Sequence, residues 1–218
     1  MLRVGLTGSL GSGKSAVAAI VREHGIPVLQ ADAIARDLMQ PGHDVYRRIV
    51  DHFGPSVVRP DGSLDRSRLA TLAFTENHAA ELNRIVHPPV IAEQERRMNE
   101  IFAADPHAIA FVESALIFEA DAWGTVPGWR QRFDRILLVT APDELKIRRF
   151  LSRVLPSRAT PEEHDAAERD ARARLAAQLS DTARIPHADF VIDNSGSLEE
   201  TRDQVEPILA QLRAQAGR

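Results

Sequence analysis

The sequence predicts an α/β protein in which a doubly wound parallel sheet of five strands carries helices on both faces. Three observations support this prediction. Short apolar segments alternate with segments of helical spacing, a glycine-rich loop joins the first strand to the first helix, and a long helical stretch interrupts the alternation. With 218 residues, 44% of them apolar, the chain is long enough for one main domain with insertions.

The individual elements follow from apolar spacing and from the residues that end each segment. The strand candidates are residues 4–7, 27–30, 108–112, 136–140 and 190–193. The helix candidates that alternate with them are residues 15–24, 31–39, 143–154 and 197–212. Gly25 ends the first of these helices, and Pro41-Gly42 ends the second.

Two segments depart from this alternation. Residues 43–105 are helical throughout, with stretches at 45–53, 66–74, 79–86 and 90–103. Residues 155–178 are rich in charge and alanine, which favours a mobile helical flap. We therefore divide the single domain of residues 1–218 into a core (about 1–42, 106–148 and 186–218), a helical insertion (about 43–105) and a lid (about 149–185).

Composition and charge exclude several classes of protein. The net charge of −4 gives no global positive field for binding nucleic acid. The absence of cysteine excludes disulfides and thiolate chemistry, and it favours a cytoplasmic protein. The first seven residues run directly into the glycine loop and no later stretch has membrane-spanning length, so we expect no signal peptide and no membrane partner. A monomer is the default expectation.

The strongest motif is the phosphate-binding loop at Gly8 to Ser15, which reads GSLGSGKS and matches G-x4-G-K-S. The backbone N–H groups of such a loop bind phosphate oxygens, and the dipole of the following helix favours the negative charge. Lys14 is expected to reach the β- and γ-phosphates of ATP, and Ser15 to ligate Mg²⁺. The predicted nucleotide-binding residues here are Gly8, Gly11, Ser12, Gly13, Lys14, Ser15 and Ala16. The plain alternative is a glycine turn that only caps the helix.

Two other nucleotide-binding classes fit less well. Asp32 lies near the position of a ribose-binding carboxylate, but the glycines run G-x-x-G-x-G where a dinucleotide-binding loop needs G-x-G-x-x-G. Asp121-Ala122-Trp123-Gly124 matches the D-x-x-G of GTPases. The chain has no N-K-x-D segment to recognise guanine, so we interpret this short match as chance.

Several segments, taken in order, resemble the dephospho-CoA kinase family over nearly the whole chain. They are GLTGSLGSGKS from Gly5, ADAIAR from Ala31, FGPSVVRPDGSLDRSRLA from Phe53, IVHP from Ile85, ESALIFE from Glu113 and ADFVIDNSG from Ala188. The resemblance implies a P-loop kinase fold in which residues 43–105 bind the acceptor. It also implies Mg²⁺-dependent transfer of the ATP γ-phosphate to the ribose 3′-hydroxyl of dephospho-CoA, the last step of CoA synthesis.

The candidate general base is Asp32, which follows a predicted strand at the edge where open α/β sheets bind ligands. A kinase carboxylate in such a place orients the acceptor hydroxyl and takes its proton. The alternative is an N-cap for the helix at 33–39. The family usually has Asp-Ala-Asp here, and this chain has Gln30 in place of the first aspartate.

Glu113 ends an apolar strand, where an acid would help to hold Mg²⁺ and contact the substrate. The family more often has aspartate at this point. A capping or loop-orienting role is the alternative for Glu113. Glu119 matches the acid that closes the same segment in the family, and exposure to solvent is its alternative.

Arg149 and Arg153 are four residues apart, so a helix presents both on one face, as a catalytic clamp for the phosphates would require. The alternative is two solvated arginines. The resemblance favours the clamp, because the family places arginines at the entrance of the lid. The family also has an Arg/Gln pattern in the lid, which Arg174 and Gln178 would match. The segment from Arg153 to Gln178 is longer than in the family, so this match is left open.

The resemblance also implies that Arg66 and His87 contact the acceptor, and that Asn194 and Gly196 lie beside the adenine of ATP. A helix stop before Pro88 equally explains the His87-Pro88 pair. For Arg66 and Asp61, likewise, contact with the acceptor and a purely structural role are equally open. Two further functions remain open: another P-loop kinase of nucleosides, nucleotides or small molecules, and an ATP-binding regulatory module without catalysis.

Overall fold

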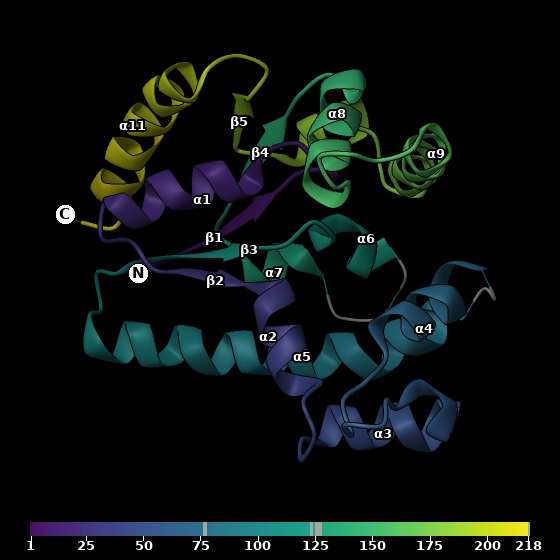
Figure 1. Cartoon of the computed structure of the whole chain (residues 1–218). Helices are drawn as coiled ribbons and strands as arrows, with labels where there is room; N and C mark the ends of the chain where they lie inside the picture. Colours follow the sequence, from purple (N-terminus) through teal and green to yellow (C-terminus); the bar gives the residue numbers. More distant parts are fainter. Residues whose placement is uncertain (76–77, 123, 125–127, 218) are drawn as a thin grey trace.

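A computed structural model describes residues 1–75, 78–122, 124 and 128–217, with the side chains of residues 74, 75 and 122 excepted (Figure 1). The D-x-x-G match therefore includes a residue, Trp123, that lies outside the described residues. The five strands are β1 (Leu2–Thr7), β2 (Val28–Gln30), β3 (Ile109–Glu113), β4 (Arg135–Thr140) and β5 (Phe190–Asp193). They pair in parallel in the order β2-β3-β1-β4-β5, which confirms the predicted doubly wound sheet.

The register of the central strands brings three chain segments to one edge of the sheet. Leu6 of β1 and Gln30 of β2 both pair with Glu113 at the end of β3. Because the strands are parallel, the segments that leave them all start at this edge. The phosphate loop after β1, the helix after β2 and the loop after β3 therefore meet there.

Helices cover both faces of the sheet, as the sequence predicts. On one face, α1 (Lys14–Glu23) and α11 (Leu198–Gln215) pack against β1, β4 and β5 in the largest hydrophobic cluster. The opposite face packs against α5 (Ala79–Ala104), α6 (Ile117–Ala122) and α7 (Trp129–Arg132). Figure 1 shows α1 and α11 on one side of the strands and α5 on the other.

The helical segment after β2 has a hydrophobic cluster of its own. Its elements are α2 (Ala31–Leu38), α3 (Asp44–Phe53), η1 (Pro55–Val57), α4 (Arg66–Ala70), the π-helical η2 (Thr71–Thr75) and the first half of α5. Val45, Ile49, Leu69 and Ile85 are among the buried residues of this cluster. That this unit binds the acceptor remains a prediction.

The predicted break in the last helix of the insertion is wrong. Helix α5 runs without interruption from Ala79 to Ala104, with Pro88 and Pro89 inside it. Each proline removes one backbone hydrogen bond and would normally end or kink a helix. Here Ile85 and Val90, on either side of the prolines, are both buried, and we infer that this packing outweighs the two lost bonds.

The predicted lid contains the end of the helix expected at 143–154 and, within residues 155–178, a second helix. Helix α8 (Asp143–Val154) is followed by a turn and by α9 (Pro161–Ala176), which begins with a capping box at Thr160 and Glu163. The two helices pack together through Phe150, Leu151 and the fully buried Ala171. The chain returns to β5 through α10 (Asp181–Arg184) and η3 (Ile185–His187). Movement of this unit remains a prediction. Within the described ranges, none of the helices is both long enough and apolar enough to span a membrane.

Candidate active site

The phosphate loop adopts a backbone shape that requires glycine at positions that include Gly11 and Gly13. Gly11 has a φ of 70° and Gly13 a φ of 95°, both in the left-handed region. A Cβ atom at Gly11 would overlap the backbone of Lys146, and one at Gly13 would overlap the side-chain amide of Asn194. Both glycines are therefore needed for conformation and for close packing.

The loop presents free N–H donors to the solvent. Among the described residues, no acceptor bonds the backbone N–H of Gly11, Gly13, Lys14 or Ser15. These donors surround the start of α1, where the helix dipole adds positive potential. The arrangement is suited to binding phosphate oxygens.

The side chain of Lys14, near the C-terminal end of the loop, reaches back to the first residues of the loop. Its Nζ donates hydrogen bonds to the carbonyl oxygens of Gly8 at 2.8 Å and Ser9 at 3.0 Å. Burial lowers the pKa of Lys14 from 10.5 to about 8, against the smaller opposing attraction of the Glu113 and Asp32 carboxylates. An anionic ligand in the loop would restore the charged form.

The end of β5 supports the loop from behind. The buried Asn194 donates from Nδ2 to the carbonyl oxygen of Ser12 at 2.8 Å and accepts a hydrogen bond from the hydroxyl of Thr201 at 2.7 Å. Arg149 of α8 donates to the carbonyl oxygen of Asn194 at 2.9 Å. Residues from three places far from the loop in sequence, Asn194, Thr201 and Arg149, thus fix the shape of the loop.

A cleft of about 630 Å³ opens in front of the loop. Most of the predicted site residues line it. They are Gly11, Gly13, Lys14, Ser15, Ala16, Asp32, Glu113, Arg149, Arg153, Asn194 and Gly196. Gly8 and Ser12 belong to the loop itself, and Ser12 is fully buried behind it.

Asp32 lies in the first turn of α2, directly after β2, and is exposed to the cleft. Helix α2 begins at Ala31, the residue before Asp32, and its N-cap is Gln30. The alternative interpretation of Asp32 as an N-cap is therefore wrong. Within the described part of the chain, no hydrogen bond or ion pair occupies its carboxylate, which is available to a ligand.

Glu113 is held by the residue that replaces the family's first aspartate. Gln30 Nε2 donates to Glu113 Oε2 at 2.8 Å, across the β2–β3 pair. The second carboxylate oxygen of Glu113 and the hydroxyl of Ser15 both belong to residues that line the cleft. Oxygen ligands of this kind suit Mg²⁺, although no group of three or more metal-binding side chains occurs in the described ranges.

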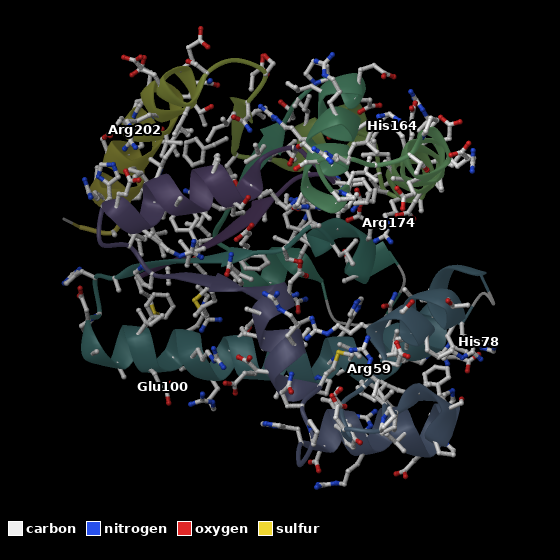
Figure 2. The ribbon with its side chains drawn as sticks, in the orientation of Figure 1. Arg59, His78, Glu100, His164, Arg174 and Arg202 are labelled. Atoms are coloured by element: carbon white, nitrogen blue, oxygen red, sulfur yellow. The ribbon has the colours of Figure 1, made fainter. Side chains whose placement is uncertain are left out.

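The two predicted clamp arginines both reach the cleft, but their surroundings differ. Arg149 is tied to the carbonyl oxygens of Ser12, at 3.5 Å, and Asn194. Arg153 lies over the ring of Phe150, with its guanidinium carbon 5.6 Å from the ring centre. Figure 2 shows Arg174 on α9, where it pairs with Asp170 at 2.9 Å and does not line the cleft.

Three predicted acceptor contacts are not brought to the cleft by this structure. Arg66 is the first residue of α4, next to the N-cap Asp65, and His87 is partly buried in the middle of α5. Burial lowers the pKa of His87, and the charge of Arg132 adds to the effect. The ambiguous Asp61 accepts hydrogen bonds from Ser63 in an exposed turn.

The alternative for Glu119, exposure to solvent, is wrong. Its side chain is only 3% exposed and forms an ion pair with Arg184, which is 0% exposed. Sequence reasoning identified the acid, but it could not identify a partner 65 residues away.

Among the polar side chains that line the cleft, Arg36 received no role from the sequence, and the role of Gln178 was left open. Arg36 follows Asp32 by four residues on α2, so helical spacing was an available signal for it. Gln178 follows α9, and only the path of the chain after that helix brings it to the loop.

The parallel sheet, the G-x4-G-K-S loop and the cleft in front of it define a P-loop kinase. The dephospho-CoA kinase family matches residues 2–200 of the sequence. The chain belongs to the dephospho-CoA kinase family. Members of this family carry out ATP-dependent phosphorylation of dephospho-CoA in CoA biosynthesis.

Individual relatives agree with this assignment. A dephospho-CoA kinase of Moorella thermoacetica is 38% identical over 98% of this chain and 93% of its own. A Thermus thermophilus protein of known crystal structure is 32% identical, with a TM-score of 0.72 over 97% of both chains. The dephospho-CoA kinase of Campylobacter jejuni shares the fold, with a TM-score of 0.65 over 98% of both chains at 22% identity.

Proposed function

We propose that this chain phosphorylates the ribose 3′-hydroxyl of dephospho-CoA with ATP, and that Asp32 and Lys14 are the central residues of its site. The observation that carries this proposal is that both side chains line one cleft, together with loop residues whose backbone N–H donors have no partner among the described residues. Lys14 and the loop would hold the triphosphate, which leaves Asp32 to face the acceptor.

The reaction needs one bond formed and one broken. The 3′-oxygen of dephospho-CoA attacks the γ-phosphorus while the bond from that phosphorus to the β,γ-bridging oxygen breaks, so ADP leaves. The hydroxyl proton passes to the carboxylate of Asp32, which is exposed to the cleft and forms no hydrogen bond with the described residues. Asp32 also orients the attacking oxygen, which we expect to be its larger contribution.

Positive charge from three side chains would stabilise the phosphoryl group during transfer. Lys14 is anchored on the loop carbonyl oxygens, and Arg149 is anchored on Ser12 and Asn194. Arg153 approaches from the next turn of α8. Because Lys14 and Arg149 are already fixed in place, they need little reorganisation as charge develops.

We further propose that Mg²⁺ accompanies the nucleotide, with Ser15 and Glu113 as the residues that hold it or its water ligands. The ion would neutralise charge on the phosphates. A cytoplasmic monomer remains our expectation for the protein. It is supported by the lack of cysteine and by a site formed within one chain.

The variant Asp32→Asn tests the proposed base, because the amide keeps the shape of the side chain but cannot take a proton. We expect kcat to fall by a factor of about 10²–10⁴ with the affinity for ATP unchanged. Asp37→Asn is the matched control, since Asp37 is exposed on the same helix and does not line the cleft. An unchanged kcat in Asp32→Asn would remove Asp32 from the mechanism.

A further inference from the structure

The chain that leaves the lid helix α9 lies directly against the phosphate loop. Gln178 Oε1 accepts a hydrogen bond from the backbone N–H of Leu10 at 2.9 Å. Three residues later, Asp181 Oδ1 accepts one from the hydroxyl of Ser9 at 3.2 Å. The side chain of Leu10 also packs against the apolar cluster of the predicted lid. Two successive loop residues are thus bound to the end of the lid.

This segment is itself anchored on buried charges. The N–H of Leu179 donates to Glu119 Oε1 at 3.1 Å, and Glu119 is paired with the fully buried Arg184. Asp181 Oδ2 accepts a hydrogen bond at 2.7 Å from the ammonium of Lys146, which is also buried. The position of Gln178 is therefore set by the anchored residues that directly follow it in the sequence.

The bond to Leu10 also fixes which way the side-chain amide of Gln178 points. A backbone N–H only donates, so the oxygen of the Gln178 amide must face Leu10. The NH₂ end is then free to face elsewhere, and in the described part of the chain it forms no hydrogen bond to another residue. Gln178 lines the same cleft as Lys14, Arg149 and Arg153, where an unused pair of N–H donors would meet an anion.

We propose that Gln178 is a binding residue for the terminal phosphate of the nucleotide. Its oxygen holds the N–H of Leu10 in place, and its NH₂ group donates to an oxygen of the phosphoryl group that is transferred. The lid would thereby detect whether a γ-phosphate is present, which ties its closure to ATP rather than to ADP. The inference rests on the proposed function in taking the cleft as the ATP site.

The substitution Gln178→Glu separates the two roles of the side chain. A glutamate still offers an oxygen to Leu10, but it has no donor and brings a negative charge next to the phosphate. Gln178→Ala removes both roles. Gln211→Glu is the matched control, because Gln211 is exposed on α11, away from the cleft.

The measurement is calorimetric binding of Mg²⁺-ADP and of the Mg²⁺ complex of a non-hydrolysable β,γ-imido ATP analogue, without acceptor. We expect Gln178→Glu and Gln178→Ala each to reduce the preference for the analogue over ADP by about tenfold or more, with ADP affinity unchanged. The control should match the wild type.

A Gln178→Glu variant that keeps the wild-type preference would overturn the proposal, because Gln178 would then only support Leu10. Equal losses for ADP and the analogue would also overturn it, since they would indicate damage to the whole loop. A wild-type protein that binds neither nucleotide would instead refute the proposed kinase function.

Discussion

Asn194 and Ser12 are joined by a hydrogen bond of 2.8 Å, from the side-chain amide at the end of β5 to a backbone carbonyl oxygen of the phosphate loop. The two residues are 182 positions apart, and the bond is buried. It connects the last strand of the sheet to the loop after the first. The shape of the nucleotide site thus depends on the closure of the fold as well as on the glycines.

The variant Asn194→Asp tests this connection. The new carboxylate would face the carbonyl oxygen of Ser12 without a donor, so we expect a loss of about 1–3 kcal/mol in the free energy of unfolding and a higher KM for ATP. Urea unfolding and steady-state kinetics measure the two effects. Asn99→Asp is the control, because Asn99 is exposed and accepts its hydrogen bond from Arg3, which a carboxylate also allows. An ATP KM unchanged in Asn194→Asp would show that the bond does not shape the loop.

The lowered pKa of Lys14 predicts proton uptake when nucleotide binds. In the free protein this pKa is about 8, so near pH 8 about half of the molecules have lost the ammonium charge. Bound phosphates favour the charged form and raise the pKa again, so binding should take up protons near pH 8, and nucleotide affinity should fall as the pH rises above that value. Calorimetry in two buffers of different ionisation enthalpy measures the uptake.

Lys14→Met is the comparison for this experiment, because methionine has no proton to gain. It should bind nucleotide weakly and without the uptake near pH 8. Uptake of the same size in Lys14→Met would assign the titration to another group.

The buried ion pair between Glu119 and Arg184 predicts a large loss of stability when one partner is removed. Arg184→Met leaves the Glu119 carboxylate buried without its counter-charge, which typically costs about 3–5 kcal/mol. The double variant Glu119→Gln with Arg184→Met removes both charges and should recover most of the loss. Urea unfolding gives both values. A double variant no more stable than Arg184→Met alone would contradict this account of the pair.

The prolines inside α5 predict a gain in stability on replacement. Pro88 is exposed and lacks the N–H that would bond the carbonyl oxygen of Arg84, so Pro88→Ala should raise the free energy of unfolding by about 1 kcal/mol or more. Pro161→Ala is the control, because Pro161 occupies the first position of α9, where an N–H has no helical partner. Destabilisation of the protein by Pro88→Ala would show that the proline conformation is required.

The sequence predicted those features of this protein that depend on residues close together in the chain, and it did not predict those that depend on tertiary contacts. The phosphate loop and Asp32 were found because a motif and a strand end are local features. The helix break predicted before Pro88 is wrong because the burial of Ile85 and Val90 outweighs the local effect of proline. That burial depends on tertiary packing, which a short stretch of sequence does not reveal.

Within the site, the same limit separates residues whose position was predicted from residues whose contacts could not be predicted. Gln178 reaches Leu10 only through the path that the chain takes after α9. The partner of Glu119 likewise depends on how α10 packs. Contacts of this kind are determined by tertiary structure, and the spacing of the residues in the sequence does not predict them.

The most direct test of the account is to incubate the purified protein with Mg²⁺-ATP and dephospho-CoA and to locate the new phosphate by ³¹P and ¹H NMR. We predict one product, in which a phosphate monoester is coupled to the 3′ hydrogen of the ribose, and no product with Lys14→Ala. A protein that binds ATP but leaves dephospho-CoA unmodified, or that phosphorylates it at another position, would contradict the account.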